Sequence, residues 1–367
     1  ELLEETVVVG YGVTKKRDLA GSVSQIKTDD IKAGLVTSTA QLIKGRAAGV
    51  HVRQSSDAPG GSISIRIRGA SSISSNNEPL YVIDGVQYDN CDNITPDDIA
   101  SIEIMKDAAS AAIFGSRGAN GVVIITTKKG SKGRVDVSYS MSGAVKKIEN
   151  PWDLMNAEET IAYGMKIWQE NGESGSAPYS EEERAYKGAG TDWIKTMTNT
   201  AFSQIHVLQA SAGTDLISGS ASITYQDDMG VVNNTNYSRY GTRANLEIRP
   251  NDKIKAGLNL NKLVSKNDYF GLDMNGGSDN LMYRMLIASP FNTLNEDGTN
   301  IFGEIAKREA VFYEIMYKDM NIITDNSAAS AFLDLNLVEG LTLRAQYSLT
   351  NENILSQNFH SKNTIYG

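Results

Sequence analysis

The chain has 367 residues, one cysteine, a mean hydropathy of −0.30 and a formal net charge of −9. Its length allows one to three domains, and the single cysteine, Cys91, excludes a disulfide framework within the chain. Residues 1–133 contain 15 Lys and Arg against 15 Asp and Glu, whereas residues 134–367 contain 20 against 29. Because no basic stripe is present, we do not expect nucleic acid as a partner.

The chain opens with a short apolar run, Glu5, Thr6, Val7, Val8 and Val9, followed by glycine. Chain ends fray unless they are tied down, so these valines are poorly placed to stabilise a core. An extended peptide can instead add to the edge of a partner's sheet through main-chain hydrogen bonds. We therefore interpret this run as a strand offered to a partner, extended and at most lightly docked until the partner binds.

Residues 20–130 have the mixed pattern of a small compact domain with short strands. The pattern predicts strands at residues 22–26, 50–54, 62–68, 80–83, 101–105 and 122–127, and helices at residues 39–48 and 107–114. Thr95-Pro96-Asp97-Asp98 predicts a further helix start, since Thr can cap, Pro suits the first helical position and acids favour the first turn. Asp84-Gly85 marks a turn.

Residues 134–352 change to alternating apolar and polar residues. The alternation predicts seven strands, at residues 135–142, 204–213, 218–225, 239–248, 254–261, 329–338 and 341–350. Short connections at 213–215, 250–252 and 339–340 alternate with long ones at 146–203, 229–237 and 267–327. All long connections then lie at one end of the sheet, which is typical of an outer-membrane barrel.

A water-soluble β-sandwich is the alternative that the strand pattern leaves open. Bacterial barrels have an even number of strands, at least eight, so seven strands predict an incomplete barrel. The first long connection contains two capping boxes, Asn156 to Glu159 and Ser180 to Glu183. They predict helices at residues 157–170 and 181–187, and hence a folded external structure.

Several blocks resemble, in the same order, the SusC/RagA-type TonB-dependent outer-membrane transporters. They are residues 5–12, which resemble the TonB box, and residues 42–50, 59–61, 65–69, 78–86 and 102–122. The match is close over residues 4–130, whereas the strands that follow match in style only.

The resemblance implies an α+β plug domain followed by an antiparallel transmembrane β-barrel, incomplete here and 22-stranded in full. The domains would be the TonB box and linker at residues 1–12, the plug at 13–133 and the first part of the barrel at 134–367, with long external loops at 146–203 and 267–327. The location would be the outer membrane of a Gram-negative bacterium. The function would be TonB-dependent import of a large nutrient, an oligosaccharide first and a peptide as the alternative.

The resemblance also implies partners. TonB, with ExbB and ExbD, would grip the box at Glu5, Thr6, Val7, Val8 and Val9, and a SusD-like surface lipoprotein would act as the lid. Outer-membrane lipid would surround the barrel, and a dimer of SusC–SusD pairs is open. The substrate, and whether an extra N-terminal domain precedes Glu1, are not determined by the sequence.

Candidate substrate contacts are polar loop residues of the plug and one aromatic residue. They are Ser71, Ser72, Ser74, Asn76 and Asn77 in one loop, Tyr88, Asp89 and Asn90 in another, and Trp152 in the first long connection. Hydroxyl and amide groups can bond sugar hydroxyls or peptide groups. The alternatives are solvated turns for the loops and a packing role for the tryptophan.

Arg66 and Arg68 share one face of a predicted strand. Because the lumen of such a barrel is polar, we expect them to hold the plug by salt bridges to wall carboxylates such as Asp334 or Glu247.

We expect no catalytic site, no metal site and no cofactor. His51, His206 and His360 lack metal-ligand spacing, and the glycine-rich residues 115–121 lack the Gly-Lys-Ser/Thr ending of a phosphate loop. A receptor that senses and signals, a passive porin and a soluble α/β enzyme are the competing function classes.

Overall fold

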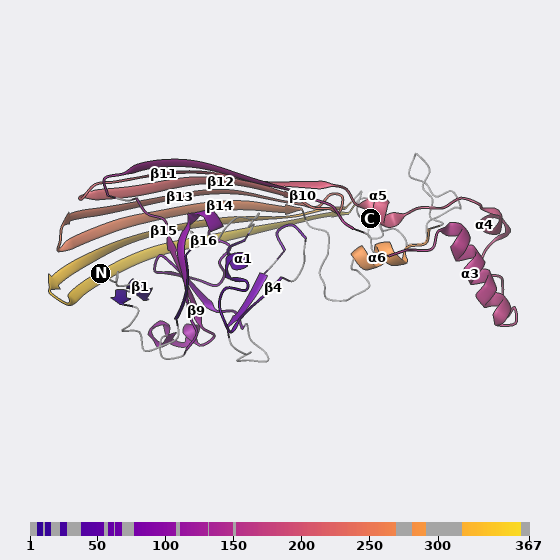
Figure 1. Ribbon diagram of the computed structural model, residues 1–367, viewed down its shortest axis with the longest axis horizontal. Helices are drawn as coiled ribbons and strands as arrows, with labels where there is room; N and C mark the ends of the chain where they lie inside the picture. Colours follow the sequence, from indigo (N-terminus) through magenta and orange to yellow (C-terminus); the bar gives the residue numbers. More distant parts are fainter. Residues whose placement is uncertain are drawn as a thin grey trace.

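The computed structural model describes residues 6–9, 12–15, 23–27, 38–54, 58–61, 63–67, 77–107, 111–130, 132–149, 152–268, 281–290 and 318–360. A curved sheet of seven long strands forms what we call the wall, and a smaller domain, the plug, sits on its concave side (Figure 1). No helix in these ranges is long and apolar enough to cross a membrane.

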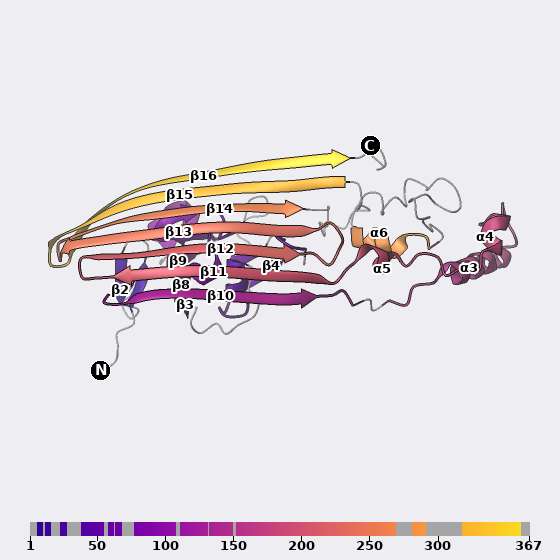
Figure 2. The same ribbon diagram turned by 90° about the horizontal axis from the view of Figure 1, so that it is seen from above.

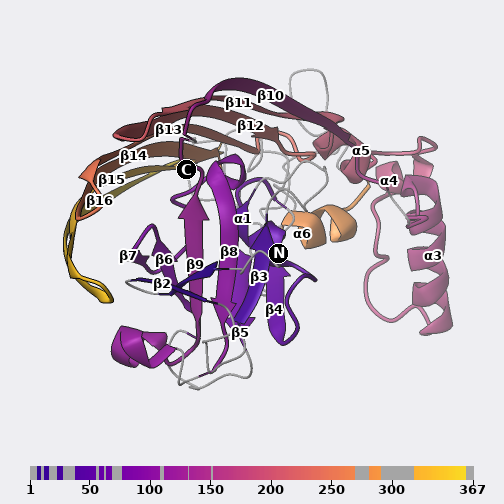
Figure 3. The ribbon, with the colours of Figure 1, turned by 60° about the vertical axis from the view of Figure 1, so that its left-hand side comes forward.

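The wall is a meander in which each strand pairs antiparallel with the next one along the chain (Figure 2). Its strands are β10 (Val135–Lys146), β11 (Ala201–Gly213), β12 (Ile217–Met229), β13 (Asn236–Asn251), β14 (Ile254–Asp268), β15 (Lys318–Val338) and β16 (Leu341–His360). The seven predicted strands are therefore present. The described strands form an open arc with β10 and β16 at its edges (Figure 3).

The last two strands are longer than the alternation predicts, at 21 and 20 residues. β15 begins inside the expected loop 267–327. Its first half carries polar residues on both faces, such as Asp325 and Asn326, so the sequence there lacks alternation although the ladder to β14 continues. Backbone pairing extends these strands beyond the apolar band.

The two faces of the wall have opposite character. Large apolar side chains on the convex face are exposed, such as Ile223 and Tyr240, both at 58%. Polar side chains on the concave face are buried, such as Thr224, Arg243 and Glu247. A soluble sandwich buries its apolar face, whereas a membrane barrel turns that face to lipid and keeps a polar lumen. The wall is thus part of a transmembrane barrel.

A row of rings crosses four strands on this convex face. Tyr139, His206, Tyr225 and Tyr240 follow one another with centroid separations of 6.2, 6.0 and 5.0 Å. The Tyr139 hydroxyl lies 2.7 Å from His206 Nδ1. Aromatic girdles mark the interfaces of membrane barrels, so this row fits a membrane boundary.

The plug is built on a five-stranded sheet of order β3-β8-β9-β6-β7, with a separate pair β4-β5. Only β6 and β9 run parallel. The elements are β3 (Val23–Lys27), α1 (Thr39–Ile43), β4 (Val50–Gln54), β5 (Ile63–Ile67), β6 (Leu80–Ile83), β7 (Val86–Tyr88), the 3-10 turn η3 (Pro96–Asp98), β8 (Ile99–Met105), the 3-10 turn η4 (Ala112–Gly118) and β9 (Val122–Thr127).

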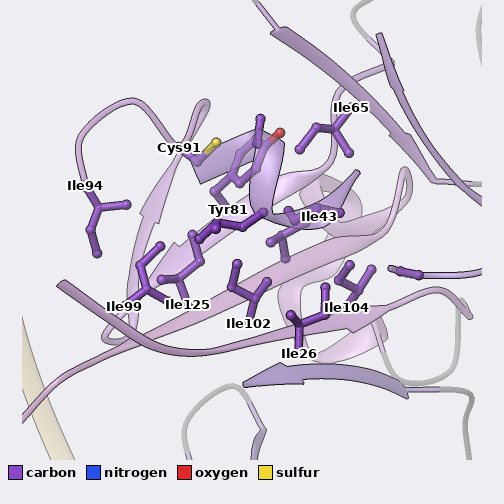
Figure 4. Close-up of a cluster of buried hydrophobic side chains, with 14 of the residues drawn as sticks. Ile26, Ile43, Ile65, Tyr81, Cys91, Ile94, Ile99, Ile102, Ile104 and Ile125 are labelled. Atoms are coloured by element: carbon purple, nitrogen blue, oxygen red, sulfur yellow. The ribbon is translucent and has the colours of Figure 1, made fainter. Parts of the chain in front are cut away.

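Both faces of the central plug strands are covered. One face packs in a cluster that includes Ile43, Ile65, Tyr81, Ile102 and Ile125 (Figure 4). The opposite face packs in a second cluster that consists of Leu80, Val82, Met105, Ala111, Phe114, Val122 and Ile124. Strands buried on both sides lack alternation, which is why β6 and β9 appear in the sequence as continuous apolar runs.

Two local predictions need correction, and a third falls partly outside the described residues. α1 ends at Ile43 rather than at residue 48, because Gly45 and Gly49 take positive φ values of 74° and 75°. η3 is a single turn whose Thr95 hydroxyl donates to Asp98 Oδ2 at 2.6 Å instead of capping the backbone. Of the expected helix 107–114, residues 108–110 lie outside the described residues, and η4 follows.

An arm of helices extends beyond the ends of the wall strands that carry the long connections (Figures 1 and 2). Its helices are α3 (Ala157–Glu170), α4 (Glu181–Ala185), α5 (Trp193–Met197) and α6 (Leu281–Ile287). Both predicted capping boxes are present, with Glu159 N donating to Asn156 at 3.0 Å and Glu183 N to Ser180 at 3.2 Å. α5 and α6 were not predicted; they pack through Trp193, Met197 and Met285.

The N-terminal run is extended but not free. β1 (Thr6–Val9) pairs antiparallel with β2 (Gly12–Lys15), with Val8 opposite Val13. This hairpin lies toward the end of the wall that carries the short turns (Figures 1 and 2). Glu5 lies outside the described residues.

Candidate functional site

A buried ion pair joins the plug to the wall. Asp84 and Gly85 form the β6–β7 turn with φ values of 49° and 86°, the left-handed conformation that a two-residue hairpin requires. The Asp84 carboxylate accepts from Thr127 N at 3.1 Å, from Thr127 Oγ1 at 2.7 Å and from Arg243 Nη2 of the wall. The Asp84 and Arg243 side chains are each 8% exposed.

A second ionic contact lies nearer the short turns. Glu247 on β13 accepts from Lys129 of the plug at 3.4 Å and lies 3.2 Å from Lys255 of the wall. Arg249 completes its set of cationic partners. One carboxylate therefore links the chain that follows β9 to the wall.

Further polar contacts across this interface are hydrogen bonds. Gln209 donates to Asp97 O at 2.8 Å, and Asn261 donates to Asn93 O at 2.9 Å. Ser220 donates to Lys128 O at 3.1 Å. The plug thus rests on the wall through polar groups, while its apolar clusters are internal.

Three cavities lie between plug and wall. The largest, about 530 Å³, opens at the end of the wall with the long connections, where its lining includes Gln41, Asn90 and Asp92 of the plug and Gln226, Arg239 and Glu352 of the wall. A cavity of about 150 Å³ shares Asn90, Asn326 and Glu352 with it. The third, about 380 Å³, lies near Lys128, Gln209 and Arg243.

Gly60 sets how closely the plug approaches the wall beside the largest cavity. Its φ is +65°, and a Cβ built there would overlap the Tyr237 ring and lie 2.9 Å from Asn267 Nδ2. A residue with a side chain would be strained and would push the plug away.

The second predicted substrate loop is at the cavities. Tyr88, Asp89 and Asn90 line the 150 Å³ cavity, and Asn90 also lines the largest one. Asp89 is bound by Arg117 at 2.6 Å, so its carboxylate is already engaged within the plug. Burial raises the pKa of the Tyr88 hydroxyl above its usual value.

Of the other candidates, the structure describes only Asn77 and Trp152. Ser71, Ser72, Ser74 and Asn76 lie outside the described residues, and Asn77 is half-buried. Trp152 is 49% exposed at the start of the arm and lines none of the three cavities.

The predicted salt bridges from Arg66 and Arg68 to the wall can be compared with the structure only for Arg66. Arg66 on β5 is exposed, and Arg68 lies outside the described residues. The two carboxylates suggested as partners have other cations: Asp334 binds Arg344 at 2.7 Å, and Glu247 binds the cluster described above. In the part of the chain that the structure describes, Asp84 with Arg243 and Lys129 with Glu247 tie the plug to the wall instead.

The sequence approach missed Arg243, Arg239 and Gln226 as site residues. Their signal was available in part. The alternation places Arg239 and Arg243 on the polar face of their strand, whereas Gln226 lies just beyond the predicted strand 218–225. What the alternation does not say is which inward residues meet the plug.

A buried acid stands apart from these contacts. Glu103 on β8 is 2% exposed, and its Oε1 accepts from Gln25 at 3.3 Å and Ser101 at 3.4 Å. Burial raises its pKa to about 7. No group of three or more potential metal-ligating side chains occurs within the described ranges.

Comparison with known families and proteins agrees with this architecture. Residues 15–122 match the TonB-dependent Receptor Plug Domain. The chain is 36% identical over 282 residues to the TonB-dependent receptor SusC of Bacteroides thetaiotaomicron, covering 73% of this chain and 27% of that protein. It is 33% identical over 378 residues to the TonB-dependent receptor P26 of Formosa agariphila, covering 99% of this chain and 37% of that protein. The chain thus spans about a third of the length of these relatives.

Solved structures show the same fold. The RagAB peptide transporter superposes with a TM-score of 0.77 at 23% identity over 92% of this chain and 42% of that chain. The RagAB peptide importer in its open-open state gives 0.76 at 24% identity over 96% of this chain and 43% of that chain.

Proposed function

Since this chain belongs to the SusC/RagA-type TonB-dependent transporters, we propose that the whole protein imports a large nutrient across the outer membrane of a Gram-negative bacterium. The nutrient is an oligosaccharide in the first instance. A peptide is the alternative, because the RagAB structures that share the fold are named as a peptide transporter.

The polar plug–wall contact carries the proposal. An apolar interface would bind the plug as firmly as a domain core, whereas ion pairs and hydrogen bonds can be exchanged for water when the plug moves. The Asp84–Arg243 pair and the bonds from Gln209 and Asn261 are contacts of this kind. A passive porin needs no such movable domain.

The N-terminal segment supplies the handle. The TonB box, residues 5–9, would be taken by TonB as an added strand, with energy from ExbB and ExbD. Pairing of β1 with β2 means that TonB must displace β2 or add to the other edge of β1. A SusD-like lipoprotein would close the outer end, where the largest cavity opens.

Replacing Val8 by Pro in the full-length protein tests the proposal. Proline removes a backbone donor and cannot sit within a paired strand, so uptake of substrate should fall to background while substrate binding persists. Val8→Thr is the matched control, because it keeps the donor and the β-branched shape. Uptake at the wild-type rate in Val8→Pro would refute the assignment; loss of uptake with a persisting transcriptional response would favour the signalling receptor.

A further inference from the structure

A buried cation and a buried amide line the largest cavity with side-chain atoms that have no hydrogen-bond partner among the described residues. Arg239 on β13 and Gln226 on β12 are direct register neighbours on the concave face of the wall. Arg239 is 4% exposed and Gln226 is fully buried. Within the described ranges, Nε of Arg239 and both polar atoms of the Gln226 side chain have no hydrogen-bond partner.

Neighbouring charged side chains on the concave face of the wall have partners of opposite charge. Lys146 binds Asp228 at 2.5 Å, and Asp228 also accepts from Ser203 at 2.6 Å. Arg243, four residues along β13, binds Asp84. Arg243 Nε also lacks a hydrogen-bond partner, but Arg243 has its ion pair with Asp84, whereas Arg239 forms no ion pair with any described residue.

Leaving these groups unpaired is unfavourable. Nearly all buried polar groups in proteins have a hydrogen-bond partner, so buried atoms without one need an explanation. Both residues line a cavity of about 530 Å³, a volume in the range of small-ligand sites. The missing partner is therefore expected to enter from the cavity.

We propose that Arg239 and Gln226 form a subsite for the carboxylate of an acidic oligosaccharide, such as one that contains uronic acid. The planar guanidinium binds a carboxylate through two parallel N–H···O bonds. The Gln226 amide has both a donor and an acceptor for the second carboxylate oxygen or an adjacent hydroxyl. This subsite rests on the import function proposed above and narrows its substrate class.

The rest of the lining favours a sugar over a peptide. Gln41, Gln54 and Asn267 contribute amides, and Ser38 and Ser265 contribute hydroxyls, all suited to sugar hydroxyl groups. Peptides are commonly bound along a free sheet edge, but β12, β13 and β14 are paired on both sides and present only a face.

Carboxylates of the protein lie at the same cavity. Asp92, Asp228 and Glu352 also line it. Asp92 interacts electrostatically with Arg239, so an acidic ligand has to compete with Asp92 for the guanidinium.

The test is equilibrium binding to the full-length protein in detergent. The probes are trisaccharides of galacturonate, glucuronate and mannuronate, each paired with its neutral galactose, glucose or mannose counterpart. We expect at least one acidic probe to bind about tenfold or more tightly than its neutral counterpart, in line with a charge-assisted bidentate pair. Arg239→Gln should remove that preference, so that no acidic probe binds more tightly than its neutral counterpart.

Two further variants keep the result interpretable. Arg239→Lys keeps the positive charge but loses the planar guanidinium with its two parallel donors, so its preference for acidic over neutral probes should be intermediate. This variant also provides a folded comparison if Arg239→Gln is unstable. Lys262→Gln removes one positive charge on the convex face, where Lys262 binds Asp325, and should change nothing.

Four results would overturn the subsite. They are equal binding of every acidic and neutral pair, an unchanged preference in Arg239→Gln, an equal loss in Lys262→Gln, and tighter binding of triglutamate than of every uronate. Uptake of a neutral sugar that depends on Val8 would leave the import function standing while the subsite fails. Uptake that is independent of Val8 would instead refute the import function.

Discussion

Breaking the Asp84–Arg243 pair should loosen the plug by a large and measurable amount. Both side chains are 8% exposed, and the carboxylate also accepts two bonds from Thr127. Removing one partner of such a pair leaves the other charge buried, which costs about 3–5 kcal/mol. Asp84→Asn keeps the shape and one oxygen that accepts from Thr127, so we expect about 3 kcal/mol there, near the low end of that range.

Cys91 provides the assay. It is the chain's single cysteine and is 4% exposed in the plug core, and burial raises the pKa of its thiol. A maleimide therefore labels it only when the plug opens. Since about 1.4 kcal/mol corresponds to a factor of ten, 3 kcal/mol should speed labelling by roughly 100-fold when opening is rapid and reversible.

The double variant identifies the pair as the cause. Asp84→Asn combined with Arg243→Met leaves no unpaired charge, so its labelling rate should lie far below the product of the two single effects. Lys262→Met, which breaks an exposed pair on the convex face, should change the rate less than about fivefold. Single variants within threefold of wild type, or a double variant equal to the product of the singles, would refute the view that this pair holds the plug.

Three further outcomes are expected. The pKa of Glu103 in the folded plug, about 7, lies above its ordinary value of 4.5. The free energy of unfolding of the plug should therefore be highest at low pH and fall by roughly 3 kcal/mol as the pH rises from 4.5 through 7. The free energy of unfolding of Glu103→Gln should stay constant over that window and exceed that of the wild type at pH 8, in urea titrations of the plug with limited proteolysis as the readout. Equal slopes of this free energy against pH for the two proteins would contradict the prediction. Gly60→Ala should destabilise the plug by about 1–3 kcal/mol, because a residue with a side chain is strained at φ +65° and its Cβ overlaps Tyr237. Gly133→Ala is the control in the Cys91 labelling assay. Gly133 also has a positive φ but has open space around it, so this variant shows the effect of backbone strain without overlap. Asn156→Ala should weaken α3 by about 1 kcal/mol in amide exchange of that helix, with plug labelling unchanged.

Much of the architecture follows from local pattern. Alternation of period two predicted all seven wall strands, because one face of each is polar and the other apolar. Asn156 and Ser180 predicted their capping boxes, since a cap depends on residues three apart in the chain. The length of β15 was not predicted, because its first half has polar residues on both faces and its pairing depends on β14, far away in the sequence.

The candidate site divides in the same way. Asn90 was predicted as a substrate contact from its polar loop alone, and it lines two cavities. The alternation placed Arg239 and Arg243 on the polar face of their strand. That Arg243 meets Asp84 whereas Arg239 meets a cavity could not be predicted, since the two residues have the same type, strand and face. The sequence by itself determined the two-faced wall, the plug core and the N-terminal strand, because these depend on the order of polar and apolar residues. Only the tertiary structure decided which inward charges are neutralised and which face open space, because that depends on where the plug docks against the wall.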